Sequence, residues 1–317
     1  FGEGTSPGPY WKDGKFTSFG EAMTMLEEKG VSVNIGSFLG AATTRILEVG
    51  YKNRQATPSE MERMRGHVEN SMKEGAMGIG SSLIYAPGDY ASTEELTELS
   101  KVASEYGGMY ISHLRSEGTN LLEALEELIS ISRNASIPAE VYHLKASREP
   151  NWSKLDDVIK RIEEVRKEGL KITADIYTYN ASSTGLTGVI PTWVQEGGHR
   201  AWINRMKDPE VRPRLLADIR EQLDEQPPEG ILLVGFKTSK MSQKYLAKTV
   251  AEAAAMRGQT PEEAIVDMVI EDDHRIQCIY FSMSEDNIRK KIQLPWVSFC
   301  SDAVSYTHLT LPTIFRV

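Results

Sequence analysis

Two of the six histidines end consecutive predicted strands. His113 follows the apolar stretch 109–112, and His143 lies near the end of 139–144, thirty residues further along the chain. Because that spacing is one strand–helix unit, we expect both imidazoles at the carboxyl edge of neighbouring parallel strands. Neutral imidazole nitrogens are ligands that zinc prefers, so the pair predicts a metal site. The alternative is that one or both histidines only hydrogen-bond inside the core.

A carboxylate ends the last predicted strand: Asp302 follows the apolar residues 296–300. Beside a metal-activated water, such a group can take the proton of that water and pass it to a leaving amine. An Asp after a strand is often only a turn or helix cap, which is the alternative. Together with the two histidines, Asp302 indicates metal-assisted hydrolysis.

Four further side chains can reach the same edge of the sheet. They are Tyr85, Lys145, Tyr177 and Tyr179. Lysine and tyrosine can bind a substrate carboxylate or polarise a carbonyl group. Taken singly, Lys145 is better explained as a solvated charge and the tyrosines as packing.

The surrounding chain alternates between predicted strands and amphipathic helices. We expect strands at 31–35, 76–80, 109–112, 139–144 and 171–177, and helices at 57–75, 92–107, 121–133 and 153–169. The segment Thr57–Glu60 is a capping box with proline at the first helical position. Near-continuous apolar strands that alternate with helices predict a parallel sheet covered by helices. A βα-barrel and an open doubly wound sheet both satisfy this pattern.

The rhythm breaks after Trp193, and residues 195–275 are predicted to form an inserted subdomain or lid. We expect helices there near 208–226 and 242–257 and from 260 onward, with a strand at 231–234. The predicted domains are therefore a first barrel part at 1–194, the insertion, and a last barrel part at 276–303. Residues 304–317 lose the acidic character of the chain and are expected to be a non-native tail.

Composition excludes several classes of protein. The 317 residues carry a formal net charge of −9, which leaves no basic surplus for binding nucleic acid or an anionic membrane. Two cysteines, Cys278 and Cys300, cannot form a disulfide framework. The chain contains no Walker-type phosphate loop and no Gly-x-Ser-x-Gly elbow, and no apolar run is long enough for a membrane span.

These motifs resemble a known family. The segments are Gly2–Pro7, Gly75–Gly88, Tyr110–Gly118, Glu140–Lys145 and Ala174–Thr184, with Ser301 and Asp302 closing the set. In order and spacing they are similar to the N-acyl-D-amino-acid deacylases, or D-aminoacylases, of the amidohydrolase superfamily. The resemblance covers about residues 1–303. It implies a zinc-dependent (β/α)8 barrel whose substrates are small molecules. The barrel would hydrolyse the amide bond of N-acyl-D-amino acids.

The resemblance also implies roles for particular residues. His113 and His143 match zinc ligands, and Asp302 matches the carboxylate that shuttles the proton. Glu3 stands in the loop where many relatives use a cysteine as an additional ligand. Four positions match residues near the bound substrate: Tyr85, Lys145, Tyr177 and Ser183.

The chain departs from the family pattern at its start. This sequence contains no counterpart of the family's first barrel strand, which carries a His-x-His pair. It also contains no counterpart of the neighbouring strand or of a small β-domain. We therefore expect an incomplete barrel and one or two zinc ions. Strand 31–35 and the strand ending at Asp302 are then expected to be open edges. The alternatives are a cyclic-amide hydrolase of the dihydropyrimidinase or hydantoinase type, and an inactive fragment. We expect a cytoplasmic or periplasmic protein of unknown oligomeric state.

Overall fold

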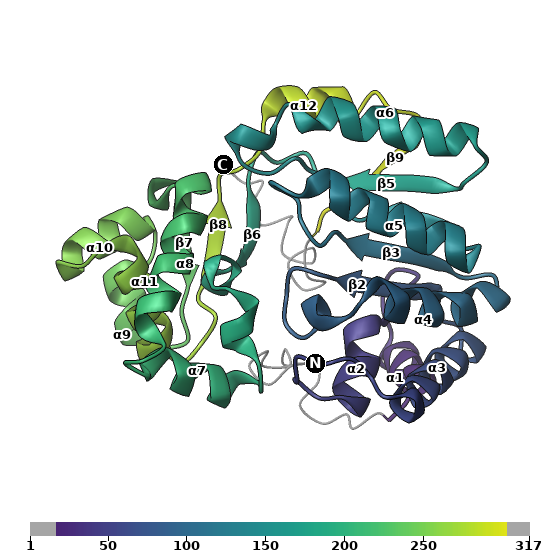
Figure 1. Cartoon of the computed structure of the whole chain (residues 1–317), viewed down its shortest axis with the longest axis horizontal. Coiled ribbons are helices and arrows are strands. Elements are labelled where there is room, and N and C mark those ends of the chain that lie inside the picture. The colour runs from purple at the N-terminus through teal and green to yellow at the C-terminus, as the bar shows by residue number, and fades with distance from the viewer. Residues whose placement is uncertain (1–16, 303–317) are drawn as a thin grey trace.

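A parallel β-sheet lies at the centre of the computed structural model, which describes residues 17–302. Its six strands follow the order β1-β2-β3-β4-β5-β9, and every neighbouring pair is parallel (Figure 1). Their bounds are β1 Leu39–Gly40, β2 Gly78–Ser82, β3 Met109–His113, β4 Ala139–Val141, β5 Ile172–Ile176 and β9 Val297–Phe299. The protein therefore has an α/β fold built on a parallel sheet.

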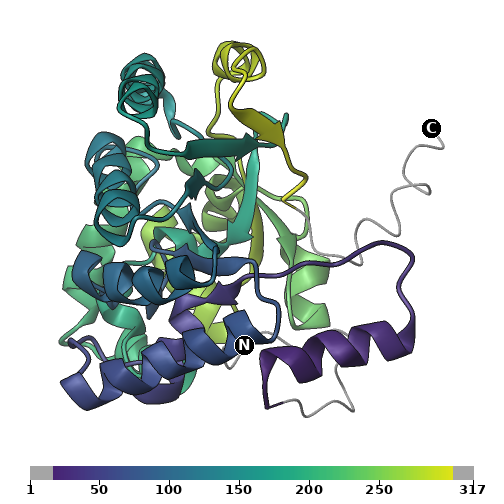
Figure 2. The same cartoon turned by 90° about the vertical axis from the view of Figure 1, so that its right-hand side faces the viewer.

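Four helices pack side by side along one face of this sheet (Figure 2). They are α3 Pro58–Lys73, α4 Thr93–Glu105, α5 Leu121–Ala135 and α6 Lys154–Lys167. Thr57 and Glu60 form the predicted capping box of α3, and the Ser92 hydroxyl accepts the Glu95 N–H at the start of α4. All four predicted helices are confirmed to within about two residues at each end.

The prediction of a strand at 31–35 is wrong. These residues form neither helix nor strand, and Val31, Val33 and Ile35 are exposed. The first strand is instead β1, which pairs with Ile79 and Gly80 of β2. Alternating β-branched residues favour a strand only where a neighbouring layer covers them, and no described layer covers 31–35. Of the two predicted open edges, only β9 therefore stands at an end of the sheet order.

A second sheet and a second core lie at the carboxyl ends of the parallel strands (Figure 1). The sheet is antiparallel in the order β6-β8-β7, with bounds Ser182–Gly185, Gln277–Tyr280 and Ile231–Gly235. Its helices are α7 His199–Lys207, α8 Arg212–Glu225, α9 Ser239–Tyr245, α10 Val250–Arg257 and α11 Pro261–Asp272. We propose that this whole stretch, 182–280, is the inserted unit, which is wider than the predicted 195–275.

The helix predicted at 242–257 is two helices, α9 and α10. Ala247 between them has a positive φ of 60°, and Thr249 with Glu252 forms a new capping box that starts α10. A cap inside an apolar periodic stretch ends one helix and begins another, because it satisfies free backbone N–H groups.

Three further α-helices complete the α-helices of the described chain: α1 Phe19–Lys29, α2 Ala41–Glu48 and α12 Glu285–Lys291. Arg45 of α2 is fully buried and forms an ion pair of 2.6 Å with Glu95 of α4.

No helix among residues 17–302 is long and apolar enough to cross a membrane.

Candidate metal centre

A cleft with a volume of about 250 Å³ lies where the carboxyl ends of the parallel strands meet the second sheet. Residues from both units line it. Those relevant to chemistry are Tyr85, His113, Glu117, Tyr142, His143, Lys145, Arg148, Tyr177, Ser183, Tyr280 and Asp302. The parallel strands therefore bring most of the predicted site residues into one cavity.

His113 is the last residue of β3, and its side chain is buried. Its Nε2 has no hydrogen-bond partner among residues 17–302. Burial lowers the pKa of His113 to about 3, and the neighbouring Glu117 carboxylate opposes that shift only in part. The imidazole is therefore neutral at physiological pH and presents a nitrogen lone pair or N–H that no described residue hydrogen-bonds.

His143 lies two residues beyond β4, in a left-handed backbone conformation with φ of 41°. Its backbone N–H donates to the Asp175 carboxylate, and the next N–H, of Leu144, donates to the Asp175 carbonyl at 2.8 Å. These bonds hold the turn that aims His143 at His113. The two rings stand edge to face with centroids 4.3 Å apart. This turn also ends β4 at Val141, three residues earlier than predicted.

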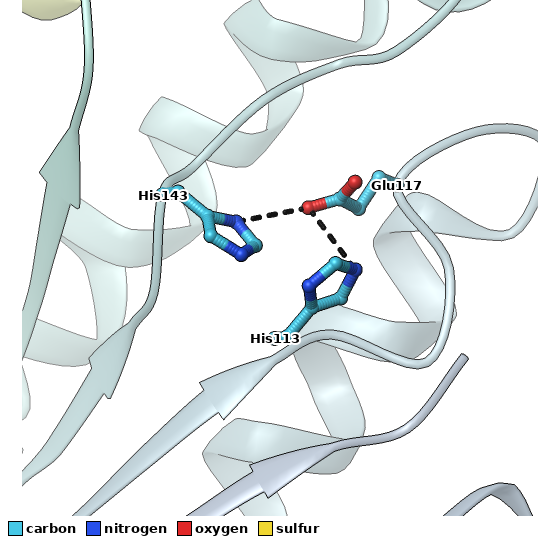
Figure 3. A group of neighbouring side chains, drawn as sticks. All are labelled: His113, Glu117 and His143. Atoms are coloured by element: carbon cyan, nitrogen blue, oxygen red, sulfur yellow. Dashed lines mark ion pairs between the residues drawn. The ribbon is translucent and has the colours of Figure 1, made fainter. Parts of the chain in front are cut away.

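Glu117, which the sequence analysis missed, joins the two histidines (Figure 3). One of its carboxylate oxygens, Oε1, lies 3.2 Å from His143 Nδ1 and 3.6 Å from His113 Nε2. The three side chains offer ligand atoms within 4.8 Å of one another. Burial opposes the charge of Glu117, but His113, Lys145 and His143 outweigh it and hold the pKa of the carboxyl well below its ordinary value.

The signal for Glu117 was its place four residues after His113, in a segment already singled out as a motif. A glutamate in a loop after a strand is common, so its type and spacing alone do not select it. Glu3, the predicted third ligand, lies outside the described residues.

The Lys145 ammonium is buried between two of these ligand atoms. Its Nζ donates to His143 Nδ1 at 2.6 Å and to Glu117 Oε1 at 2.7 Å. It also lies 5.3 Å from the centroid of the Tyr177 ring. A positive charge thus already occupies the position beside the donors, which is the place a metal cation would favour.

The remaining predicted residues surround this cluster. Tyr177 is buried, and its hydroxyl has no hydrogen-bond partner among residues 17–302. Burial, with Glu117 and Asp302 adding to it, raises the pKa of Tyr177 far above its ordinary value. The Tyr85 ring lies 5.7 Å from the His113 ring, and its hydroxyl is 2.8 Å from Thr184 Oγ1.

Asp302 and Ser183 lie at the rim of the cleft and are both exposed. The surrounding protein still raises the pKa of the Asp302 carboxyl through desolvation, and the neighbouring His143 and Lys145 oppose this shift. The Ser183 hydroxyl donates to the Cys278 carbonyl at 3.1 Å. Tyr179 is mainly exposed and does not line the cleft.

We compared the chain with protein-family profiles, curated proteins and solved structures. No protein-family profile matches the chain. A D-aminoacylase of Alcaligenes xylosoxydans xylosoxydans is 32% identical over 172 residues, which cover 54% of this chain and 35% of that protein. An N-acyl-D-glutamate deacylase of the same organism is 29% identical over 159 residues, which cover 50% of this chain and 33% of that protein.

The chain resembles the N-acyl-D-amino-acid deacylases. It spans about a third of the length of these curated relatives, 35% of the D-aminoacylase and 33% of the N-acyl-D-glutamate deacylase.

Solved structures agree on the fold. A D-aminoacylase structure superposes with a TM-score of 0.73 at 24% identity and covers 96% of this chain and 56% of its own. The N-acyl-D-glutamate deacylase of Bordetella bronchiseptica gives a TM-score of 0.73 at 23% identity and covers 90% of this chain and 52% of its own. That deacylase was crystallised with zinc and a phosphonate inhibitor that mimics the tetrahedral intermediate of the reaction.

Proposed function

We propose that this chain carries the metal-binding part of a zinc-dependent hydrolase that cleaves the amide bond of N-acyl-D-amino acids. The observation that carries the proposal is the cluster of His113, Glu117 and His143 in a cleft at the ends of neighbouring parallel strands. The similarity to D-aminoacylases supports it independently. We further propose that the six parallel strands belong to a (β/α)8 barrel, which is the finer architecture that the family resemblance implies.

The residues present fit a zinc ion. His113 is neutral and keeps a buried nitrogen that has no hydrogen-bond partner among residues 17–302. Two nitrogen donors with one carboxylate oxygen are a usual ligand set of catalytic zinc sites. We propose His113, Glu117 and His143 as ligands, with Glu3 as an additional one. A bound divalent cation would compete with the Lys145 ammonium for His143 and Glu117. When bound, the ion would act as a Lewis acid that activates water and polarises the acyl carbonyl.

Asp302 is the proposed proton carrier. Its carboxylate accepts a proton from the attacking water and returns it to the nitrogen of the leaving amine as the amide bond breaks. Its place in the cleft and its raised pKa suit a group that alternates between the two protonation states.

Tyr85, Lys145, Tyr177 and Ser183 are the proposed contacts of the small-molecule substrate. Tyr177 contributes a buried hydroxyl that no described residue hydrogen-bonds and that can donate to a carbonyl or carboxylate oxygen of the substrate. Lys145, once displaced from the ligand atoms, supplies an ammonium that can pair with the substrate carboxylate.

Metal content and substrate range test the proposal together. The dialysed protein is expected to retain about one zinc ion per chain, and His143→Ala to lose it. His67→Ala is the matched control, because His67 lies on α3 and pairs with Glu48 away from the cleft. Zinc content that is equal in the wild type and in His143→Ala would contradict the ligand assignment.

The zinc-loaded protein is then assayed on N-acetyl-D-amino acids, their L enantiomers and a cyclic amide such as dihydrouracil. We expect hydrolysis of the D compounds. Turnover of the cyclic amide alone would favour the alternative hydrolase, and zinc binding without any turnover would favour an inactive fragment.

A further inference from the structure

A second cavity of about 250 Å³ lies beside the cleft of the candidate metal centre. Tyr85 lines both, so its side chain forms the wall between them. Aliphatic residues line part of the second cavity, and its aromatic and polar side chains include Tyr51, Gln195, His199, Trp202 and Arg275. Among the described residues that line it, none is an aspartate or a glutamate.

Arg275 is the cation of this cavity, and it is half-buried. Within residues 17–302 it forms no ion pair, and its guanidinium makes a single long hydrogen bond, from Nη2 to Thr184 Oγ1 at 3.4 Å. The nearby carboxylate of Asp273 is already engaged by His199 and Lys237. A half-buried guanidinium has five N–H donors, so Arg275 keeps most of its capacity to bind an anion.

The position of Arg275 relates it to the metal centre. The Tyr85 ring lies 5.7 Å from the His113 ring and 5.8 Å from the Arg275 guanidinium carbon. Thr184, which lines the first cleft, accepts the Arg275 hydrogen bond and also bonds the Tyr85 hydroxyl. The Tyr85 ring therefore separates the histidines from Arg275, so a ligand whose amide lies at the histidines must extend past this ring to bring a second functional group to Arg275.

The arginine that lines the first cleft is less suited to bind an anion. Arg148 lines that cleft, but its guanidinium is already paired with the Glu225 carboxylate at 3.1 Å and with Gln222. An anion there would have to compete with an existing carboxylate. No carboxylate among the described residues competes in this way for Arg275.

We propose that the second cavity is a carboxylate-binding subsite and that Arg275 binds the carboxylate at the far end of the substrate. This inference rests on the proposed function for the position of the amide. The carboxylate belongs either to the side chain of the amino acid or to the acyl group, because both extend from the same amide.

Paired ligands that differ in one charge test the subsite. Isothermal titration calorimetry compares N-acetyl-D-glutamate with N-acetyl-D-glutamine for a side-chain carboxylate, and N-succinyl-D-alanine with N-butyryl-D-alanine for an acyl carboxylate. The wild-type protein is expected to bind the charged member of one pair about tenfold more tightly, which is what a charge-assisted hydrogen bond contributes. The pair that shows the preference identifies the source of the carboxylate.

Variants assign the preference to a residue. In Arg275→Gln the ratio of the two affinities is expected to fall towards one, whereas Arg275→Lys retains part of it and serves as the check that the cavity remains folded. Arg148→Gln should keep the full ratio. Equal affinities in the wild type, or a preference that is lost in Arg148→Gln and kept in Arg275→Gln, would overturn the subsite.

The same experiment separates the two proposals. A charge preference that depends on Arg275 in a protein that hydrolyses none of these compounds would support the subsite and contradict the proposed function. Hydrolysis of the neutral N-acyl compounds without any charge preference would support the function and overturn the subsite.

Discussion

His113 and His143 are held by different backbone devices, although both stand at strand ends. His113 ends β3 itself, whereas His143 depends on a left-handed turn that Asp175 of the next strand stabilises. Glu117 and Lys145 form an ion pair beside the imidazoles, and the Glu117 carboxylate also lies against His143. The cluster is thus a network in which every member contacts at least one other. The effects of substitutions at two of its members are therefore expected not to add when the substitutions are combined.

Asp302→Asn tests the role of the proton carrier. Asparagine has nearly the same shape but cannot accept a proton, so we expect turnover of the zinc-loaded protein to fall by about 10²–10⁴-fold with zinc content unchanged. Steady-state kinetics and elemental analysis measure the two quantities. Asp286→Asn, at an exposed position of α12, is the control and should retain both. Wild-type turnover in Asp302→Asn would show that Asp302 is only a turn residue.

At the scale of elements, α12 is tied to the loop that carries His143. Lys291 of α12 is buried, and its Nζ donates to the Leu144 carbonyl at 2.6 Å. Burial lowers the pKa of Lys291 to about 8, Lys145 adds to this effect and Glu117 opposes it. The hydrogen bond positions the loop, while the buried charge costs stability at neutral pH.

The pH dependence of stability tests this assignment. Between the folded pKa of about 8 and the ordinary 10.5, the unfolded chain binds more protons at Lys291 than the folded one, so raising the pH through this window stabilises the fold. Relative to Lys291→Met, the wild type is expected to gain up to about 3 kcal/mol of unfolding free energy across it. Urea denaturation at several pH values measures the gain, with exposed Lys290→Met as control. Parallel curves for wild type and Lys291→Met would contradict the assignment.

At the scale of the molecule, two cores face one another across the cleft, and polar contacts join them. Glu225 at the end of α8 accepts from Thr119 at 2.5 Å and from Arg148 at 3.1 Å. At a second point of contact between the two units, the Tyr90 hydroxyl donates to the Thr192 carbonyl at 2.7 Å. Hydrogen bonds and an ion pair therefore join the second sheet and its helices to the loops beside the candidate site.

Glu225→Ala is expected to weaken the contact between the two units, because it removes the hydrogen bonds from Thr119 and Arg148. Because Glu225 is about one-third exposed, with 35% of its side chain accessible, the loss of overall stability should be about 1 kcal/mol or less. The local effect is larger: amide hydrogen exchange should accelerate at the end of α8 and in the loop around Thr119. Glu221→Ala, on the exposed side of the same helix, is the matched control. Unchanged exchange at both sites in Glu225→Ala would show that other contacts hold the units together.

The sequence by itself determined the local elements and the outline of the site. Helix starts followed from capping residues such as Thr57 and Ser92, because a cap acts within one turn of the chain. The closeness of His113 and His143 followed from two strand ends one strand–helix unit apart, and β3 and β4 are indeed parallel neighbours. The strand at 31–35 was predicted wrongly, because residue alternation says nothing of which layer covers it.

Only the tertiary structure decided which side chains converge. Glu117 lies in a loop whose course depends on packing, and Lys145 is placed between ligand atoms because the turn at His143 redirects the chain. Arg275 lies ninety residues beyond Gly185 and is brought against Thr184 and Tyr85 by the pairing of β6 with β8. Such contacts join residues far apart in the chain, and their geometry is set by sheet register and packing, which local sequence patterns do not encode.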